Sequence, residues 1–104
     1  MGKNRDREAL ISLIISTVVH ELLVQHTNRL ESEHFLKSEV TEYFEQVKET
    51  ASEHTWNDSD KEYIKERALK KIKNRMEFKY PDVQFTEKEA KDLLDKVISE
   101  LNQI

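Results

Sequence analysis

The sequence contains no cysteine and only one glycine and one proline among its 104 residues. Without cysteine, the chain cannot form disulfides, use a thiol nucleophile or bind zinc through thiolates. All-β folds and phosphate-binding loops need glycine at positive φ, so the single glycine, Gly2, argues against both. These absences leave a chain built of helices, and its length predicts one domain, residues 1–104, with a modest core.

Long hydrophobic runs are also lacking. The uncharged stretch from Ala9 to His20 has 12 residues, or roughly 18 Å of helix, which is too short to cross a bilayer. No small-residue cleavage site of a signal peptide follows it, and "MGKNRD" lacks the serine or threonine of a myristoylation signal. We therefore expect a cytoplasmic protein without membrane contact, in which this run belongs to the core.

Charge is abundant but unevenly distributed. Apolar residues and charged residues each make up 37% of the chain, and the net charge is −4. Residues 31–56 carry two basic and seven acidic side chains, or −5, whereas residues 57–80 carry eight basic and five acidic ones, or +3. We expect the acidic second and fourth helices to complement the basic third helix in a bundle.

Four segments have apolar residues at helical spacing, which predicts four helices. The first runs from about residue 6 to 28, and the second from about 33 to 53. No glycine or proline marks the break between them. We place this break in the polar segment "HTNRLESE", residues 26–33, although one bent helix would also fit the pattern.

The third and fourth helices have capping signals at their starts. Ser59 can cap the third helix, and Glu62, three residues later, can complete a capping box. Thr86 and Glu89 form the same pattern at the start of the fourth helix. Between these helices, Pro81 disfavours helical backbone at the residue before it. The sequence therefore predicts a connector around Pro81.

This connector, in "MEFKYPDVQF", is rich in apolar residues. We expect it to lie across the core with its aromatic side chains tucked in, and a short strand is the alternative. The apolar residues concerned are Phe78, Tyr80, Val83 and Phe85.

The first helix is apolar around most of its circumference. Its apolar residues from Leu10 to Val24 cover about 240°, and the remaining strip is only weakly polar. A helix that packs on one side needs little more than 100°. The sequence therefore predicts an all-α antiparallel bundle of about four helices, with the first helix either at the centre or at a dimer interface.

If the first helix is shared with a second chain, one side of it must face the partner. Ile11, Ile15 and Val18 form one candidate side, and Leu13 with Val24 form the other. Trp56, alone in the polar segment "EHTWNDSD", is a further candidate interface residue, because tryptophan is enriched among residues that dominate binding. The alternative is that Trp56 covers one end of the bundle.

Two patterns approximate metal sites. The segment "HELLVQH" is close to the HExxH zinc motif, but His20 and His26 are six residues apart and point about 120° apart on a helix. Glu31 and His34 have the ExxH spacing of di-iron bundles, which use the motif twice. Because the pattern occurs once here, only a dimer would complete such a site. We predict no metal and no cofactor, with a di-metal bundle as a remote alternative.

The basic segment "KERALKKIKNR" is a candidate binding surface. Its Lys70, Lys71, Lys73 and Arg75 could contact nucleic-acid phosphates. However, the charges surround the helix, and the acidic chain as a whole repels nucleic acid. The helices are also too long for a compact helix-turn-helix with its short recognition helix. Nucleic-acid binding is therefore the second hypothesis, and a solvated face paired with glutamates is the simpler interpretation.

Catalytic patterns are absent from the sequence. No serine or threonine lies in a glycine-framed nucleophile elbow, and no pair of carboxylates is marked out as buried. We therefore predict no catalytic residues and a non-enzymatic helical protein that acts through protein–protein interaction. The wide apolar surface of the first helix favours self-association, as a homodimer, in addition to or instead of binding another protein.

Overall fold

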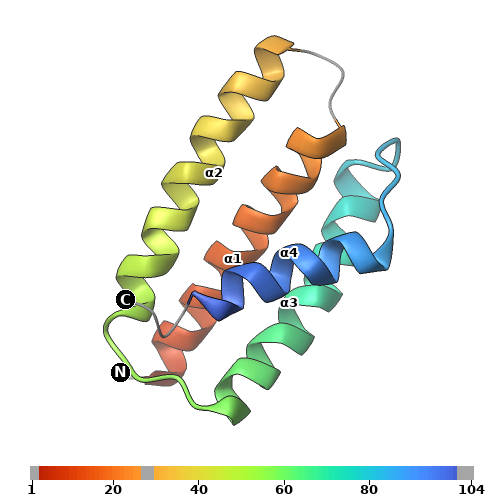
Figure 1. Ribbon diagram of the computed structural model, residues 1–104. Coiled ribbons are helices and arrows are strands. Elements are labelled where there is room, and N and C mark those ends of the chain that lie inside the picture. Colours follow the sequence, from red (N-terminus) through yellow and green to blue (C-terminus); the bar gives the residue numbers. More distant parts are fainter. Residues whose placement is uncertain (1–2, 27–29, 101–104) are drawn as a thin grey trace.

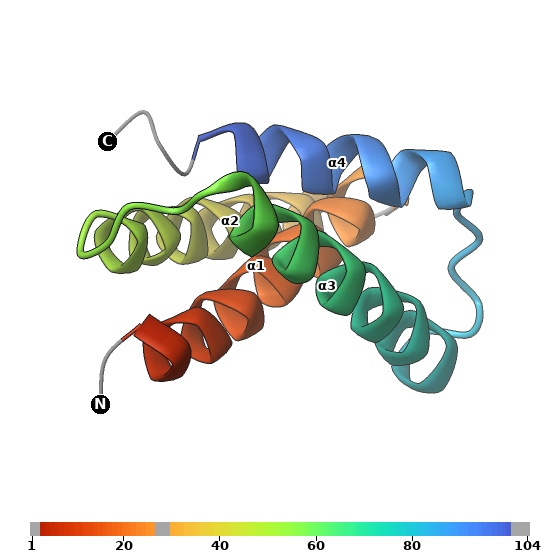
Figure 2. The same ribbon diagram turned by 90° about the horizontal axis from the view of Figure 1, so that it is seen from below.

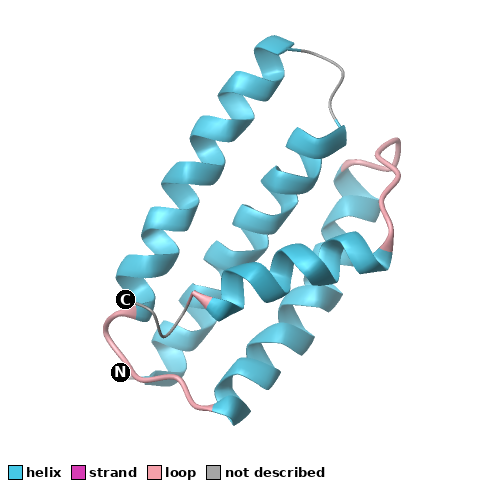
Figure 3. Ribbon diagram, in the orientation of Figure 1, coloured by secondary structure: helices cyan, strands magenta, loops and turns pink. Residues whose placement is uncertain are grey.

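Four helices make up the described part of the chain: α1 (Lys3–His26), α2 (Leu30–Ala51), α3 (Asp58–Lys79) and α4 (Glu87–Ser99). The computed structural model describes residues 3–26 and 30–100, with side chains at 3–26 and 37–100, and no strand occurs in these ranges (Figure 3). The helices form a bundle, which confirms the predicted fold class. The first helix ends and the second begins within the predicted segment, residues 26–33.

α1 lies at the centre of the bundle and contacts each of the other three helices. α2 and α3 lie on opposite sides of α1, and α4 packs across both α1 and α3 (Figures 1 and 2). Three neighbours explain why α1 is apolar around most of its circumference, and the central placement is one of the two that we predicted. The buried residues of α1 are Leu10, Ile11, Ile14, Ile15, Thr17, Val18, Val19 and Leu22.

α1 also meets the length and composition of a membrane-spanning helix, with a mean hydropathy of 1.5 over an 18-residue window. In the bundle, 44% of that window is buried. A helix surrounded by three others must be apolar on most sides, so the packing is sufficient to explain its composition. The expectation that the protein makes no membrane contact stays a prediction.

The start of α3 differs from the prediction. Asn57, not Ser59, is the N-cap: its side chain accepts a hydrogen bond from the backbone N–H of Asp60 at 2.8 Å. The Asp60 carboxylate accepts one in return from the N–H of Asn57 at 3.2 Å. Lys3 and Arg7 of α1 lie 2.6 Å and 3.9 Å from the same carboxylate. These contacts from α1 fix Asp60, and the spacing of nearby residues could not reveal them.

The start of α4 agrees with the prediction. The Thr86 side chain accepts a hydrogen bond from the N–H of Glu89 at 3.0 Å, and Glu89 accepts one from the N–H of Thr86 at 3.3 Å. This reciprocal pair satisfies two backbone donors that the helix itself leaves free. The capping box therefore sets where the chain turns from the connector into α4.

The connector between α3 and α4 is only partly as predicted. Tyr80, Val83 and Phe85 pack against the core, in agreement with the prediction. Phe78 does not, because α3 continues to Lys79 and Phe78 lies in its last turn with 86% of its surface exposed. Phe78 follows the buried Met76 by two residues, which places it about 200° away around the helix.

Charge pairing was predicted between the third helix and both the second and the fourth, and the structure confirms only part of this. Lys65 and Lys73 of α3 each lie 2.8 Å from a carboxylate of α4, Asp95 and Glu87 respectively, so the pairing of third and fourth helices is confirmed. The second helix lies on the far side of α1. The ion pairs described for α3 go to α4 and to the start of α1, and none of them goes to α2.

Candidate interaction surfaces

The four residues that we predicted at an interface are core residues of this chain. The exposed fractions of Ile11, Ile15 and Val18 are 1%, 2% and 0%, and that of Trp56 is 1%. The Trp56 indole N–H donates a hydrogen bond to the carbonyl of Ala51 at 2.9 Å. None of these side chains can reach a partner while the bundle is folded. Self-association stays a prediction, and it needs a different surface.

The histidines of the near-HExxH segment bind different helices. His20 lies 2.6 Å from Glu39 of α2, and its other ring nitrogen lies 2.8 Å from the carbonyl of Ser16. His26 lies 2.9 Å from Glu89 of α4. Each imidazole thus joins α1 to one neighbour, and the two do not share a site. The other metal candidates, Glu31 and His34, lie outside the residues whose side chains are described.

Sequence reasoning missed one group of possible metal ligands. Ligand atoms of Asp6, Glu53 and His54 lie within 4.8 Å of one another. The group joins α1 to the turn after α2, and 48 positions separate Asp6 from His54, so no local spacing could indicate it. His54 Nε2 and the Asp6 carboxylate are hydrogen-bonded at 2.5 Å, and Glu53 is exposed. That hydrogen bond alone explains why two of the three groups approach each other.

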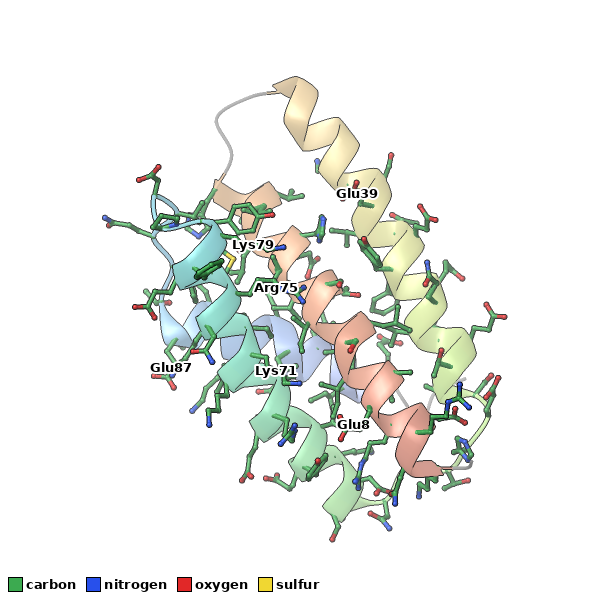
Figure 4. All side chains as sticks on the ribbon, turned by 180° about the vertical axis from the view of Figure 1, so that it is seen from behind. Glu8, Glu39, Lys71, Arg75, Lys79 and Glu87 are labelled. Carbon is green, nitrogen blue, oxygen red and sulfur yellow. The ribbon has the colours of Figure 1, made fainter. Side chains whose placement is uncertain are left out.

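The four basic residues predicted for nucleic-acid binding do not form one surface. Lys73 is engaged with Glu87 of α4. Lys70 and Lys71 line a shallow hollow of about 190 Å³ together with Arg67 and Asn74. Arg75 lies one turn beyond Lys71 on α3, where both are labelled in Figure 4. Two of the four residues therefore share a site.

An exposed aromatic residue lies on the same side of α3 as this hollow, outside its lining. Phe78 follows Asn74 by one helical turn and is the only large hydrophobic side chain described as exposed. We define the α3 surface as the exposed residues at three- and four-residue spacing, which lie on one face of the helix. They are Glu66, Arg67, Lys70, Lys71, Asn74, Glu77 and Phe78. The α3 surface thus combines three cationic side chains and one apolar ring with two carboxylates at its edge.

Another hollow lies on a different part of the molecule, between α1, α2 and α4. It has a volume of about 360 Å³, at the lower end of the range for ligand pockets. Its apolar floor consists of Val40, Phe44 and Val97. We call it the α2 groove, because most of its residues come from α2. The other residues that line it are Glu21, Thr41, Glu45, Lys48, Lys96 and Glu100.

Acidic side chains surround the α2 groove. Glu21, Glu45 and Glu100 contribute carboxylates, against two amines from Lys48 and Lys96. The Lys48 amine lies 3.9 Å from Glu45 and the Lys96 amine lies 4.0 Å from Glu21, so one more carboxylate than amine lines the groove. The Lys48 amine lies 5.0 Å from the centre of the Phe44 ring, so part of the groove floor is covered by a cation–π contact. Glu42 and Glu49 of α2 add further exposed carboxylates, and so does Glu53 in the turn after α2. The molecule therefore has an acidic α2 edge and a basic α3 surface, on opposite sides of α1 (Figure 1).

The titratable groups are arranged as structural ion pairs. Hydrogen bonds from Lys3, Lys73 and His26 are the largest causes that lower the pKa of Asp60, Glu87 and Glu89 respectively. The hydrogen bond with Asp95 raises the pKa of Lys65. None of these four groups is buried. A catalytic acid or base is typically displaced by burial in a cleft, and these groups do not follow that pattern.

Two surfaces of the described residues combine charged groups with apolar ones: the α3 surface with its exposed phenylalanine, and the α2 groove with its apolar floor. Comparison of the chain with protein-family models, with curated proteins and with solved structures found no similar protein.

Proposed function

We propose that this chain is a non-enzymatic helical protein that acts by binding a protein partner through the α3 surface. The observation that carries the proposal is the exposed ring of Phe78, which lies on the same side of α3 as three basic side chains that form no ion pair with any described residue. Burial of a phenylalanine side chain is worth roughly 1.5–3 kcal/mol. A partner that covers this ring gains that free energy, and acidic groups around it would fix its orientation.

The charges of the α3 surface support an acidic partner. The Arg67 guanidinium lies 5.6 Å from the centre of the Tyr63 ring, which holds it on the outer side of α3. Lys70 and Lys71 are exposed beside it. The other basic residues of α3 that face α4, Lys65 and Lys73, already have carboxylate partners. Arg67, Lys70 and Lys71 therefore offer three cations on one side of the helix. Lys61, Arg75 and Lys79 lie on its other sides.

Nucleic acid is the second candidate, because Arg67, Lys70, Lys71 and Asn74 line a common hollow that could accept a phosphate. The charge balance disfavours it. The chain carries a net charge of −4, and the exposed Glu66 lies on the same side of α3. A long-range field of this sign slows association with a polyanion. A protein partner needs opposite charges only where it contacts the α3 surface.

The test compares two variants that change the net charge equally. The α3 variant carries Lys70→Glu, Lys71→Glu and Phe78→Ala, and the control carries Lys88→Glu and Lys91→Glu on the exposed outer side of α4. Tagged wild type and both variants are used for capture after nuclease treatment, and each captured protein is then purified and tested for direct binding. A protein bound by wild type and control, but not by the α3 variant, supports the proposal.

Two results would contradict it. If the same proteins bind all three forms equally, the α3 surface is not the binding site. If the capture is lost on nuclease treatment, and a DNA or RNA oligonucleotide binds the purified wild type with a steep salt dependence, the partner is nucleic acid.

A further inference from the structure

We infer that the α3 surface also recognises a second copy of this chain, and that it docks on the α2 groove in a head-to-tail contact. The inference rests on the proposed function, since it assigns a partner to the same surface. Phe78 of one copy would lie on the apolar floor of the α2 groove of the next. The basic residues around Phe78 would face the carboxylates around the groove.

The apolar parts of the two surfaces complement each other. Phe78 projects from the last turn of α3 with 86% of its surface exposed. The floor of the α2 groove is formed by two partly buried residues, Val40 and Phe44, with Val97 beneath them. Aromatic rings in contact gain about 0.5–1.5 kcal/mol beyond the burial of their area, provided that they stack offset or edge to face. Phe44 offers such a partner to Phe78.

The charged parts complement each other as well. On the α3 surface, Lys70 and Lys71 are exposed and carry positive charge. On the α2 edge, Glu42 and Glu45 are exposed and lie three residues apart, one turn along the helix. The segments that contain them carry +3 in residues 57–80 and −5 in residues 31–56. A chain with a net negative charge can thus attract its own copies when these two faces meet.

The arrangement of the helices excludes an intramolecular contact between the two surfaces. α2 and α3 lie on opposite sides of α1, so the α3 surface cannot reach the α2 groove of its own chain (Figure 1). A contact between unlike surfaces is heterologous, and each added copy leaves one free surface of each kind. Association would therefore continue beyond a dimer, as open chains or as a closed ring.

A charge-exchange experiment tests the inference. One variant, the α3 exchange, carries Lys70→Glu and Lys71→Glu; the other, the α2 exchange, carries Glu42→Lys and Glu45→Lys. Circular dichroism first checks that each is folded. Sedimentation velocity then measures association from micromolar to millimolar concentration at low and moderate salt. We expect wild type to form species larger than a dimer at low salt, and we expect salt to reduce them, because exposed charges are screened.

Each exchange alone should abolish association, because it leaves two surfaces of like charge. An equimolar mixture of the two should restore it, since each exchanged surface then meets an oppositely charged one. Phe78→Ala should weaken the association constant by about tenfold or more, and the Lys88→Glu, Lys91→Glu control should associate like wild type.

Several results would overturn the inference. The first is a wild type that is monomeric at every concentration and salt, and the second is a mixture of folded exchange variants that does not associate. The third is a dimer that is sensitive only to changes in α3, which would indicate that two α3 surfaces contact each other.

The proposed function can survive this failure. A monomeric wild type whose capture of another protein still depends on the α3 surface overturns the head-to-tail contact only. Capture that is independent of the α3 surface contradicts the proposed function, whatever sedimentation shows.

Discussion

His26 and Glu89 join the last residue of α1 to the first turn of α4, with 2.9 Å between Nε2 of the imidazole and Oε2 of the carboxylate. Glu89 also closes the capping box with Thr86, so one carboxylate serves both a local and a long-range contact. The hydrogen bond with His26 is the largest cause that lowers the pKa of Glu89 from its ordinary value of 4.5.

The first prediction concerns the acid stability that follows from this pair. A carboxyl with a lowered pKa in the folded chain stabilises the fold above its unfolded pKa, and the contribution is lost as the pH falls through the folded pKa. We expect Glu89→Gln to flatten the decline in the free energy of unfolding below about pH 4.5. Urea unfolding of wild type and variant between pH 3 and 7 measures how the free energy of unfolding depends on pH. Glutamine can still accept the cap hydrogen bond, so the variant keeps the start of α4. If Glu66→Gln flattens the pH dependence of the unfolding free energy equally, the effect does not come from the pair of His26 and Glu89.

The second prediction distinguishes the two N-cap residues of α3. Asn57→Ala removes the side-chain acceptor of the Asp60 N–H and should lower the free energy of unfolding by about 1 kcal/mol. Ser59→Ala should change it by less than about 0.5 kcal/mol, since Ser59 is exposed in the first turn. Equilibrium unfolding in urea compares the two variants directly. If Ser59→Ala lowers the free energy of unfolding more than Asn57→Ala does, Ser59 is the N-cap, as the sequence suggested.

The third prediction separates core from surface aromatic residues. Trp56 is 1% exposed, so Trp56→Ala should cost about 3–5 kcal/mol in unfolding free energy, through lost burial and a remaining cavity. Phe78→Ala should change it by less than about 0.5 kcal/mol, because its ring is exposed. Trp56 is the only tryptophan, so its fluorescence should be blue-shifted in wild type and move to longer wavelength on unfolding. An unfolded-like emission in the native protein would mean that Trp56 is accessible.

The fourth prediction concerns the group formed by Asp6, Glu53 and His54. We expect elemental analysis of untagged protein to find no stoichiometric zinc or iron. Asp6 and His54 are already hydrogen-bonded to each other, and the Lys3 amine lies 5.4 Å from the ring centre of Trp56, which His54 also contacts. A nearby cation disfavours a second one. A ratio close to one metal per chain that disappears in His54→Ala would show the opposite.

The helices were predictable because their signals are local. Apolar spacing reveals four amphipathic segments, and the Thr86 capping box needs only residues three apart. The α3 cap was not predictable in the same way. The sequence "NDSD" contains Asn57 as well as Ser59, and both residue types are favoured at an N-cap. In the structure, Asp60 completes the Asn57 cap and also lies 2.6 Å from Lys3 of α1, a long-range contact that no pattern of neighbouring residues reveals.

The surfaces were harder to predict than the fold. A helical wheel shows that α1 is apolar on most sides, but it does not show what covers it, so Ile11, Ile15 and Val18 could be either core or interface residues. Phe78 was misplaced for a related reason. Whether an aromatic residue near a helix end is buried depends on where that helix stops, and α3 runs on to Lys79.

The central position of α1 has a consequence for the synthesis of the chain. About 60 residues separate the end of α1 from the start of α4, and at 5–20 residues per second a ribosome needs roughly 3–12 s to make them. During that interval α1 can pair with α2, but the side that α4 will cover stays exposed to water. The nascent chain therefore exposes one apolar side of α1 until α4 has been made and covers it.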